Sequence, residues 1–91
     1  MADIVVTLRI MPSSPEADLH SIETNAKKEI VHFCNSEEFK TNIQPIAFGL
    51  KAVEILFVMD EKIGSTEALE EKIKHIENVE SVEVTDVRRT V

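Results

Sequence analysis

The chain has 91 residues, a net charge of −7 and 43% hydrophobic residues, which fit one small domain with a single core. The excess of acidic residues argues against a protein that binds nucleic acid through its phosphates, because such binding needs a basic surface. With four Phe, no Tyr and no Trp, a base-stacking platform is also disfavoured. We therefore expect one domain over residues 1–91, whose charge either only maintains solubility or steers it to a basic surface on another protein.

The cellular location is indicated by features that the sequence lacks. Its one cysteine, Cys34, cannot form an internal disulfide, which is the usual sign of a small secreted protein. No apolar run approaches the roughly 18–20 residues that span a membrane, and the start MADIVVTLRI does not resemble a signal peptide. The sequence predicts a soluble cytoplasmic protein without membrane contact.

A strand and a helix are expected first. Residues 3–11 alternate between apolar and more varied positions, which is typical of a strand with one buried face. A helix should follow the PSSP loop, with Ser14 as its N-cap and Pro15 at its first position, and should end near Asn35. The apolar residues that we expect on the core-facing stripe of this helix are Leu19, Ile22, Ala26, Ile30 and Phe33.

The middle of the chain predicts two strands joined by a turn. Residues 37–46 are mostly polar, and Pro45 cannot donate a hydrogen bond to a neighbouring strand, so this segment should be an edge strand. Residues 50–59 are apolar almost throughout, which suits a strand buried on both faces or nearly so. Between them, Gly49 marks a sharp turn that also carries the large side chain of Phe48.

A second helix and a last strand complete the pattern. Ser65 or Thr66 should cap a helix that runs to about His75 and is closed by Asn78. The last strand then carries Val79, Val82, Val84 and Val87. The order strand, helix, strand, strand, helix, strand predicts an α+β, ferredoxin-like sandwich, with two helices on one face of a four-stranded antiparallel sheet.

The sequence carries no motif for catalysis, metal binding or nucleotide binding. Two glycines, Gly49 and Gly64, cannot supply a glycine-rich phosphate loop, so we expect neither a bound nucleotide nor a cofactor. His32 and Cys34 are two residues apart on the predicted helix and face different ways, which disfavours a zinc site. The many carboxylates are typical of solvated surface, and no nucleophile–base pattern is present. We expect a protein that is not an enzyme and has no catalytic or metal-binding residue.

Three stretches of the sequence resemble a known family. DIVVTLRIMPSSPEADL, QPIAFGLKAVEILFVMDEKIG and VESVEVTDVRR are similar to archaeal elongation factor 1-beta and, through it, to the C-terminal exchange domain of the eukaryotic factor. The resemblance extends over essentially the whole chain. It implies a ferredoxin-like fold and guanine-nucleotide exchange on elongation factor 1-alpha, the GTPase that delivers aminoacyl-tRNA.

The resemblance also implies where the partner binds. In the eukaryotic domain, the Phe of the matching turn packs against the GTPase near its nucleotide pocket, and this role carries over to Phe48. The eukaryotic domain ends in a lysine that reaches the magnesium site of the GTPase, but this chain has no lysine after Lys74. A terminal arginine would supply the cation instead, unless the two arginines are only a solvated pair. The partner-binding residues implied are Pro45, Ile46, Phe48, Gly49, Asp86, Arg88 and Arg89.

The residue pattern by itself leaves two alternatives open. An aromatic residue at a turn more often folds back onto the core than stays exposed, so Phe48 is either a core residue or a partner anchor. Ferredoxin-like domains of this size also serve as small-ligand regulatory modules or dimerisation units. A ligand-binding module usually has glycines at a strand–helix junction, and the first junction here, IMPSSPEADL, has none, whereas an open sheet face would still allow self-association.

Overall fold

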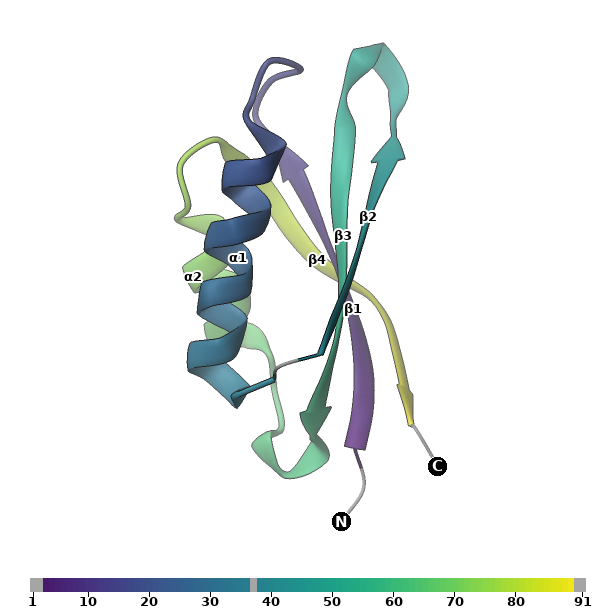
Figure 1. Ribbon diagram of the computed structural model, residues 1–91, viewed down its shortest axis with the longest axis vertical. Coiled ribbons are helices and arrows are strands. Elements are labelled where there is room, and N and C mark those ends of the chain that lie inside the picture. Colours follow the sequence, from purple (N-terminus) through teal and green to yellow (C-terminus); the bar gives the residue numbers. More distant parts are fainter. Residues whose placement is uncertain (1–2, 37, 90–91) are drawn as a thin grey trace.

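Four strands and two α-helices form the fold in the computed structural model, which describes residues 3–36 and 38–89. The strands are β1 (Asp3–Pro12), β2 (Phe39–Pro45), β3 (Lys51–Asp60) and β4 (Val79–Arg89). The helices are α1 (Leu19–Cys34) and α2 (Glu67–Lys74), and two short 3-10 turns, η1 (Ala47–Gly49) and η2 (Glu61–Ile63), follow β2 and β3. Neighbouring strands are antiparallel, in the order β2-β3-β1-β4. The predicted α+β, ferredoxin-like sandwich is confirmed (Figure 1).

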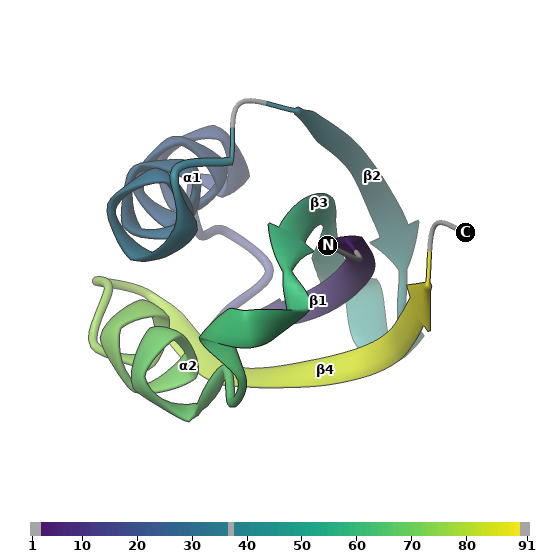
Figure 2. The same ribbon diagram turned by 90° about the horizontal axis from the view of Figure 1, so that it is seen from below.

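Both helices lie on the same face of the sheet (Figure 2), and the core fills the space between the two layers. The central strands β1 and β3 contribute most of it, because alternate side chains of each strand point to the helices. Burial of one large aliphatic or aromatic side chain stabilises the fold by about 1.5–3 kcal/mol. The largest buried side chains are Phe57, Leu8, Ile10, Ile22, Ile30, Ile55, Leu69, Ile73, Val6 and Val53.

The prediction that β3 is buried on both faces is wrong for one of them. Ile55 and Phe57 face the helices and are at most 1% exposed. Leu56 and Val58 lie on the opposite face and are only half-buried. The difference follows from the layer arrangement, since α1 and α2 both cover the first face (Figure 2).

The edge position of β2 is confirmed, because β2 pairs only with β3 among the strands of the described residues. Pro45 ends the strand opposite Lys51, where its missing N–H costs little. The predicted strand began at residue 37, which lies outside the described residues, and the observed strand begins at Phe39.

The first helix begins four residues later than predicted, at Leu19. Ser14 does not cap it, since the Ser14 carbonyl accepts a hydrogen bond from the Ala17 N–H (3.2 Å) and closes a separate tight turn. The N-cap is Asp18, whose Oδ1 accepts a hydrogen bond from the Ser21 N–H at 3.2 Å. At its other end the helix stops as predicted, with Asn35 in the left-handed conformation (φ 55°).

The second helix is shorter than predicted, because it ends at Lys74 with His75 as its C-cap. Thr66 occupies the N-cap position without a capping hydrogen bond from its side chain, and Ser65 Oγ instead accepts a hydrogen bond from the Glu67 N–H at 3.1 Å. Asn78 does not close the helix itself. It adopts a left-handed conformation (φ 71°) in the turn that leads into β4.

The molecule is elongated, with dimensions of 42 × 21 × 19 Å. The β2–β3 hairpin forms one end and extends past the helices, whereas η2 and the end of β4 lie at the other (Figure 1). This arrangement determines where the predicted partner-binding residues lie. No helix in the described part of the chain is long and apolar enough to cross a membrane.

Candidate functional site

Phe48 lies at the tip of the β2–β3 hairpin and is 94% exposed. The turn is closed by backbone hydrogen bonds from the Ile46 N–H to the Leu50 carbonyl (2.7 Å) and from the Leu50 N–H to the Ala47 carbonyl (3.3 Å). These bonds hold the turn without any contribution from the aromatic ring. The core interpretation of Phe48 is therefore excluded, and the ring is presented to solvent.

The backbone of this tip is strained at Phe48. Its φ of 63° lies in the left-handed region, and Gly49 follows with a φ of 77°. Glycine adopts such angles readily, but a residue with a side chain loses roughly 1–2 kcal/mol there. An exposed aromatic ring on a strained backbone contributes little to stability, which points to a role in binding.

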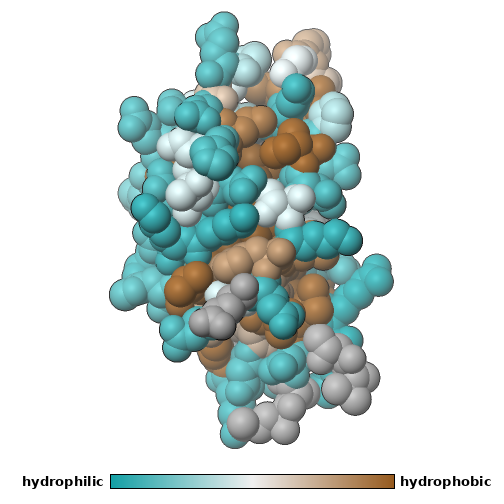
Figure 3. Space-filling model, viewed as in Figure 1, coloured by the Kyte–Doolittle hydropathy of each residue, from teal (hydrophilic) through white to brown (hydrophobic). Residues whose placement is uncertain are grey.

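The residues around Phe48 add apolar surface to the hairpin tip. Pro45 is exposed and Ile46 is half-buried, and Ile43 in β2 is 44% exposed. Figure 3 shows apolar side chains reaching the surface at the end where this hairpin lies. Four of the residues that the sequence predicts for partner binding, Pro45, Ile46, Phe48 and Gly49, are thus brought together on one tip.

The other three predicted residues lie at the end of β4 and form ion pairs there. Arg88 Nε lies 2.7 Å from Asp86 Oδ2, and Arg89 Nη2 lies 3.1 Å from Glu61 Oε2. Both arginine side chains are exposed (79% and 69%), so each pair stabilises the fold by at most about 1 kcal/mol. The segment TDVRRTV continues to Thr90 and Val91, which lie outside the described residues.

A β-bulge sets the positions of these side chains. Val84 lies opposite Leu8 and Asp86 opposite Thr7, so Thr85 is an extra residue in β4. Thr85 Oγ1 donates a hydrogen bond to the Thr7 carbonyl at 3.5 Å. As a result, Asp86 points to the open face of the sheet, where Arg88 can pair with it.

The structure separates the predicted site into two groups. The hairpin tip and the end of β4 are divided by the length of β3, from Lys51 to Asp60, which is about 30 Å at the usual rise per residue. The seven predicted residues therefore lie in two groups at opposite ends of the sheet. The sequence analysis also missed Glu61 as the partner of Arg89, although Glu61 belongs to the DEKIG segment that carries the family resemblance.

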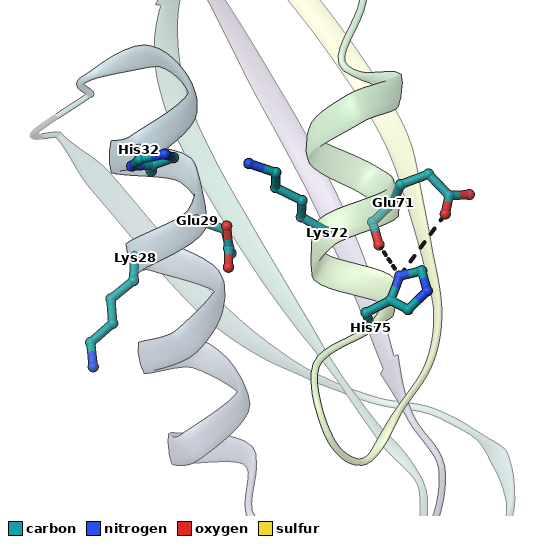
Figure 4. A pocket seen from close by; sticks show the side chains of 6 residues that line it. All are labelled: Lys28, Glu29, His32, Glu71, Lys72 and His75. Atoms are coloured by element: carbon teal, nitrogen blue, oxygen red, sulfur yellow. Dashed lines mark hydrogen bonds and ion pairs between the residues drawn. The ribbon is translucent and has the colours of Figure 1, made fainter.

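A groove of about 740 Å³ runs between α1 and α2 on the side away from the sheet (Figure 4). It is lined by Lys28, Glu29, His32, Glu71, Lys72 and His75. His75 Nδ1 lies 2.7 Å from the Glu71 carbonyl oxygen, and Glu29 and Lys72 project between the helices. Within residues 3–36 and 38–89, no three His, Cys, Asp or Glu side chains are grouped so that they could hold a metal ion.

Cys34 is not an activated nucleophile. Its Sγ donates a hydrogen bond to the Ile30 carbonyl at 3.4 Å in the last turn of α1. Burial raises the pKa of the Cys34 thiol, and a hydrogen bond from the Ser36 backbone only partly offsets this effect. The protonated thiol therefore dominates at neutral pH.

Comparisons with known proteins show the family to which the chain belongs. Residues 5–90 match the family described as the EF-1 guanine nucleotide exchange domain. Relatives named elongation factor 1-beta occur in Methanothermobacter thermautotrophicus (42% identical over 89 residues) and Methanosphaera stadtmanae (39% over 90 residues). Each of these alignments covers 98% of both chains.

Two solved structures are similar in fold. The de novo designed protein Foldit4 has a TM-score of 0.62 at 25% identity, over 98% of this chain and 97% of the designed one. BlrP1 BLUF has a TM-score of 0.55 at 14% identity over the whole of this chain and 57% of its own, and shows the fold alone. From the match over nearly all of its length and from its archaeal relatives, we conclude that the chain belongs to the family of EF-1 guanine nucleotide exchange domains.

Proposed function

We propose that the protein promotes exchange of GDP for GTP on elongation factor 1-alpha, acting over residues 1–91 as one exchange domain. The observation that carries the proposal is the exposed ring of Phe48 on a left-handed backbone. Backbone hydrogen bonds hold the turn but leave the ring 94% exposed, whereas a pocket on a partner would bury it.

The hairpin tip acts as the apolar anchor. Aromatic side chains that enter a pocket at an interface contribute about 2 kcal/mol or more each. Pro45 and Ile46 extend the apolar surface next to Phe48, and Gly49 gives the turn its shape. The tip thus provides affinity for the GTPase.

The end of β4 provides the cationic contact. Guanidinium groups match phosphate oxygens in geometry and charge, so Arg88 or Arg89 suits the nucleotide and magnesium side of the GTPase. Because the two ends are about 30 Å apart, the tip and the arginines contact separate places on the partner. Asp86 holds Arg88 and belongs to the same contact.

The mechanism is one of linked equilibria. If the protein binds the nucleotide-free GTPase more tightly than the loaded one, nucleotide binding to the GTPase is weakened by the same factor. No covalent bond is made or broken, so the protein is an exchange factor and not an enzyme. It holds no cofactor, nucleotide or nucleic acid itself, has no membrane contact, and works in the cytoplasm with its GTPase.

The test is the release of a fluorescent guanine nucleotide from purified elongation factor 1-alpha, with and without the protein. We expect faster release, saturating with protein concentration, and no heat of binding when GDP or GTP is titrated into the protein alone. An unchanged release rate would contradict the proposal. Gel filtration of the protein alone and with the GTPase distinguishes an exchange factor from a dimerisation unit. A dimerisation unit would elute as a dimer and would not form a complex with the GTPase.

A further inference from the structure

We infer that Glu61 is a positioning residue for Arg89, and that their ion pair joins the turn after β3 and the end of β4 into one partner-contact surface. The inference rests on the proposed exchange function. It adds a residue outside the predicted site and distinguishes between the two arginines.

The geometry of η2 fixes the backbone on both sides of Glu61. Asp60 Oδ1 accepts a hydrogen bond from the Lys62 N–H at 2.9 Å, and the Glu61 carbonyl accepts one from the Gly64 N–H at 3.1 Å. Gly64 closes the turn with a φ of 81°, which suits glycine. The Glu61 carboxylate therefore projects from a defined turn, and it meets Arg89 Nη2 at 3.1 Å.

Arg88 and Arg89 differ in the position of their ion-pair partners. Arg88 pairs with Asp86, two residues earlier in the same strand, whereas Arg89 pairs with a residue of a different element. Only the second pair links two segments that are distant in the sequence. A cation held in place before binding loses less side-chain freedom when it engages an anion of the partner.

The contact with Glu61 leaves other hydrogen-bond donors of the Arg89 guanidinium available. A guanidinium has five N–H donors in a fixed fork, so a contact at Nη2 leaves capacity for a second acceptor such as a phosphate or carboxylate oxygen. The pair is also exposed, with side-chain exposures of 69% and 38%. Ion pairs in contact with water are weak, which allows Arg89 to exchange Glu61 for a partner group.

Each partner of the ion pair has an exposed apolar residue close to it in the sequence. Ile63 is 40% exposed and lies two residues after Glu61, and Val87 is 53% exposed and lies two residues before Arg89. An arginine among exposed apolar side chains is a typical composition for the centre of a protein interface. The ion pair and its flanking side chains thus form a contact surface remote from Phe48.

The experiment compares saturating rates of nucleotide release for Glu61→Gln, Glu61→Asp, Arg89→Gln and the double variant Glu61→Gln with Arg89→Gln. Glu77→Gln is the matched control, because Glu77 is an exposed acid in the turn after α2 and outside both contact groups. Thermal melts of each variant separate changes in exchange from changes in folding.

We expect Glu61→Gln to lower the saturating rate about three- to fivefold, the range that one exposed ion pair allows, with little change in the concentration needed for half-saturation. Glu61→Asp should keep at least about half of the rate, and the double variant should be no slower than Arg89→Gln, because the two residues act together. Glu77→Gln should match the wild type.

A Glu61→Gln rate equal to or above that of the wild type, or additive losses in the double variant, would overturn the inference. Loss of acceleration by the wild type itself would instead overturn the proposed function.

Discussion

Arg88 and Arg89 project from opposite faces of the sheet, because Arg88 lies opposite Val5 and Arg89 opposite Ile4 on β1. Val5 is on the open face, and Ile4 packs against the core under the helices. The two guanidinium groups therefore form their ion pairs on different sides of the molecule. A single partner surface cannot use them equally.

We predict that Arg89→Ala slows nucleotide release more than Arg88→Ala. Loss of a hydrogen-bonded charge at a contact costs about 1.5–3 kcal/mol, so Arg89→Ala should slow release at least about tenfold, and Arg88→Ala less than about threefold. Both side chains are largely exposed, so thermal melts should change little. Equal release rates for both variants and the wild type would show that the two arginines are only a solvated pair at the end of β4.

Phe48→Ala should leave the fold intact and weaken the complex. The ring buries almost nothing in the free protein, but as an anchor it should contribute about 2 kcal/mol or more, which is about thirtyfold in affinity. Phe57→Ala is the matched control, because Phe57 is 1% exposed and its truncation should cost about 3–5 kcal/mol of stability. Calorimetry with the nucleotide-free GTPase and thermal melts measure the two effects. A Phe48→Ala variant that binds as tightly as the wild type would exclude the anchor.

Phe48→Gly separates the backbone strain from the aromatic ring. Both Phe48→Ala and Phe48→Gly remove the ring, but only glycine adopts a φ of 63° without strain. The glycine variant should therefore be more stable than the alanine variant by about 1 kcal/mol, which raises the melting temperature by about 4–8 °C for a domain of this size. Equal melting temperatures would show that the turn relaxes to another conformation in solution.

Association with the GTPase should become slower as salt is added. The net charge of −7 attracts a basic partner surface, and the range of this attraction falls from about 10 Å at 0.1 M salt to about 3 Å at 1 M. Stopped-flow measurements should show the association rate constant falling while the dissociation rate constant changes less. An association rate constant that does not depend on salt would exclude electrostatic steering but leave the exchange activity untouched.

Cys34 should react slowly with alkylating agents in the folded protein. Burial raises the pKa of its thiol, so the reactive thiolate forms only at a higher pH than in an unfolded chain. The pH profile of iodoacetamide labelling, with the urea-unfolded protein as the control, measures this difference. By linkage, the folded state loses stability as the pH rises from the thiol pKa of the unfolded chain towards that of the folded chain. Coincident labelling profiles would contradict the shift.

Much of the fold follows from local patterns in the sequence. The alternation in β1, the helical stripe of α1 and Pro45 on an edge strand are all observed as predicted. The start of α1 was missed because Ser14 and Asp18 are both good N-caps, and only the tight turn at 14–17 decides between them. Local patterns also cannot show which face of β3 the helices cover.

The candidate site was harder to predict than the fold. Whether Phe48 points inward depends on backbone angles at a turn, which apolar character does not reveal. The separation of the hairpin tip from Arg88 and Arg89 depends on strand direction and length, so it appears only once the sheet is assembled. Glu61 is paired through the tertiary structure, and its spacing from Arg89 in the sequence gives no signal.

The position of β1 between β3 and β4 has a consequence for how the chain is made. β1 precedes the other described strands in the chain, yet its pairing with β4 joins residues 4–12 to residues 79–89. Contacts between segments so far apart in sequence form late, because the intervening chain must first be closed into a loop. The nascent chain therefore leaves one edge of the central strand β1 unpaired until Val79–Arg89 has been made, and a factor that serves translation completes its own sheet only when β4 is available.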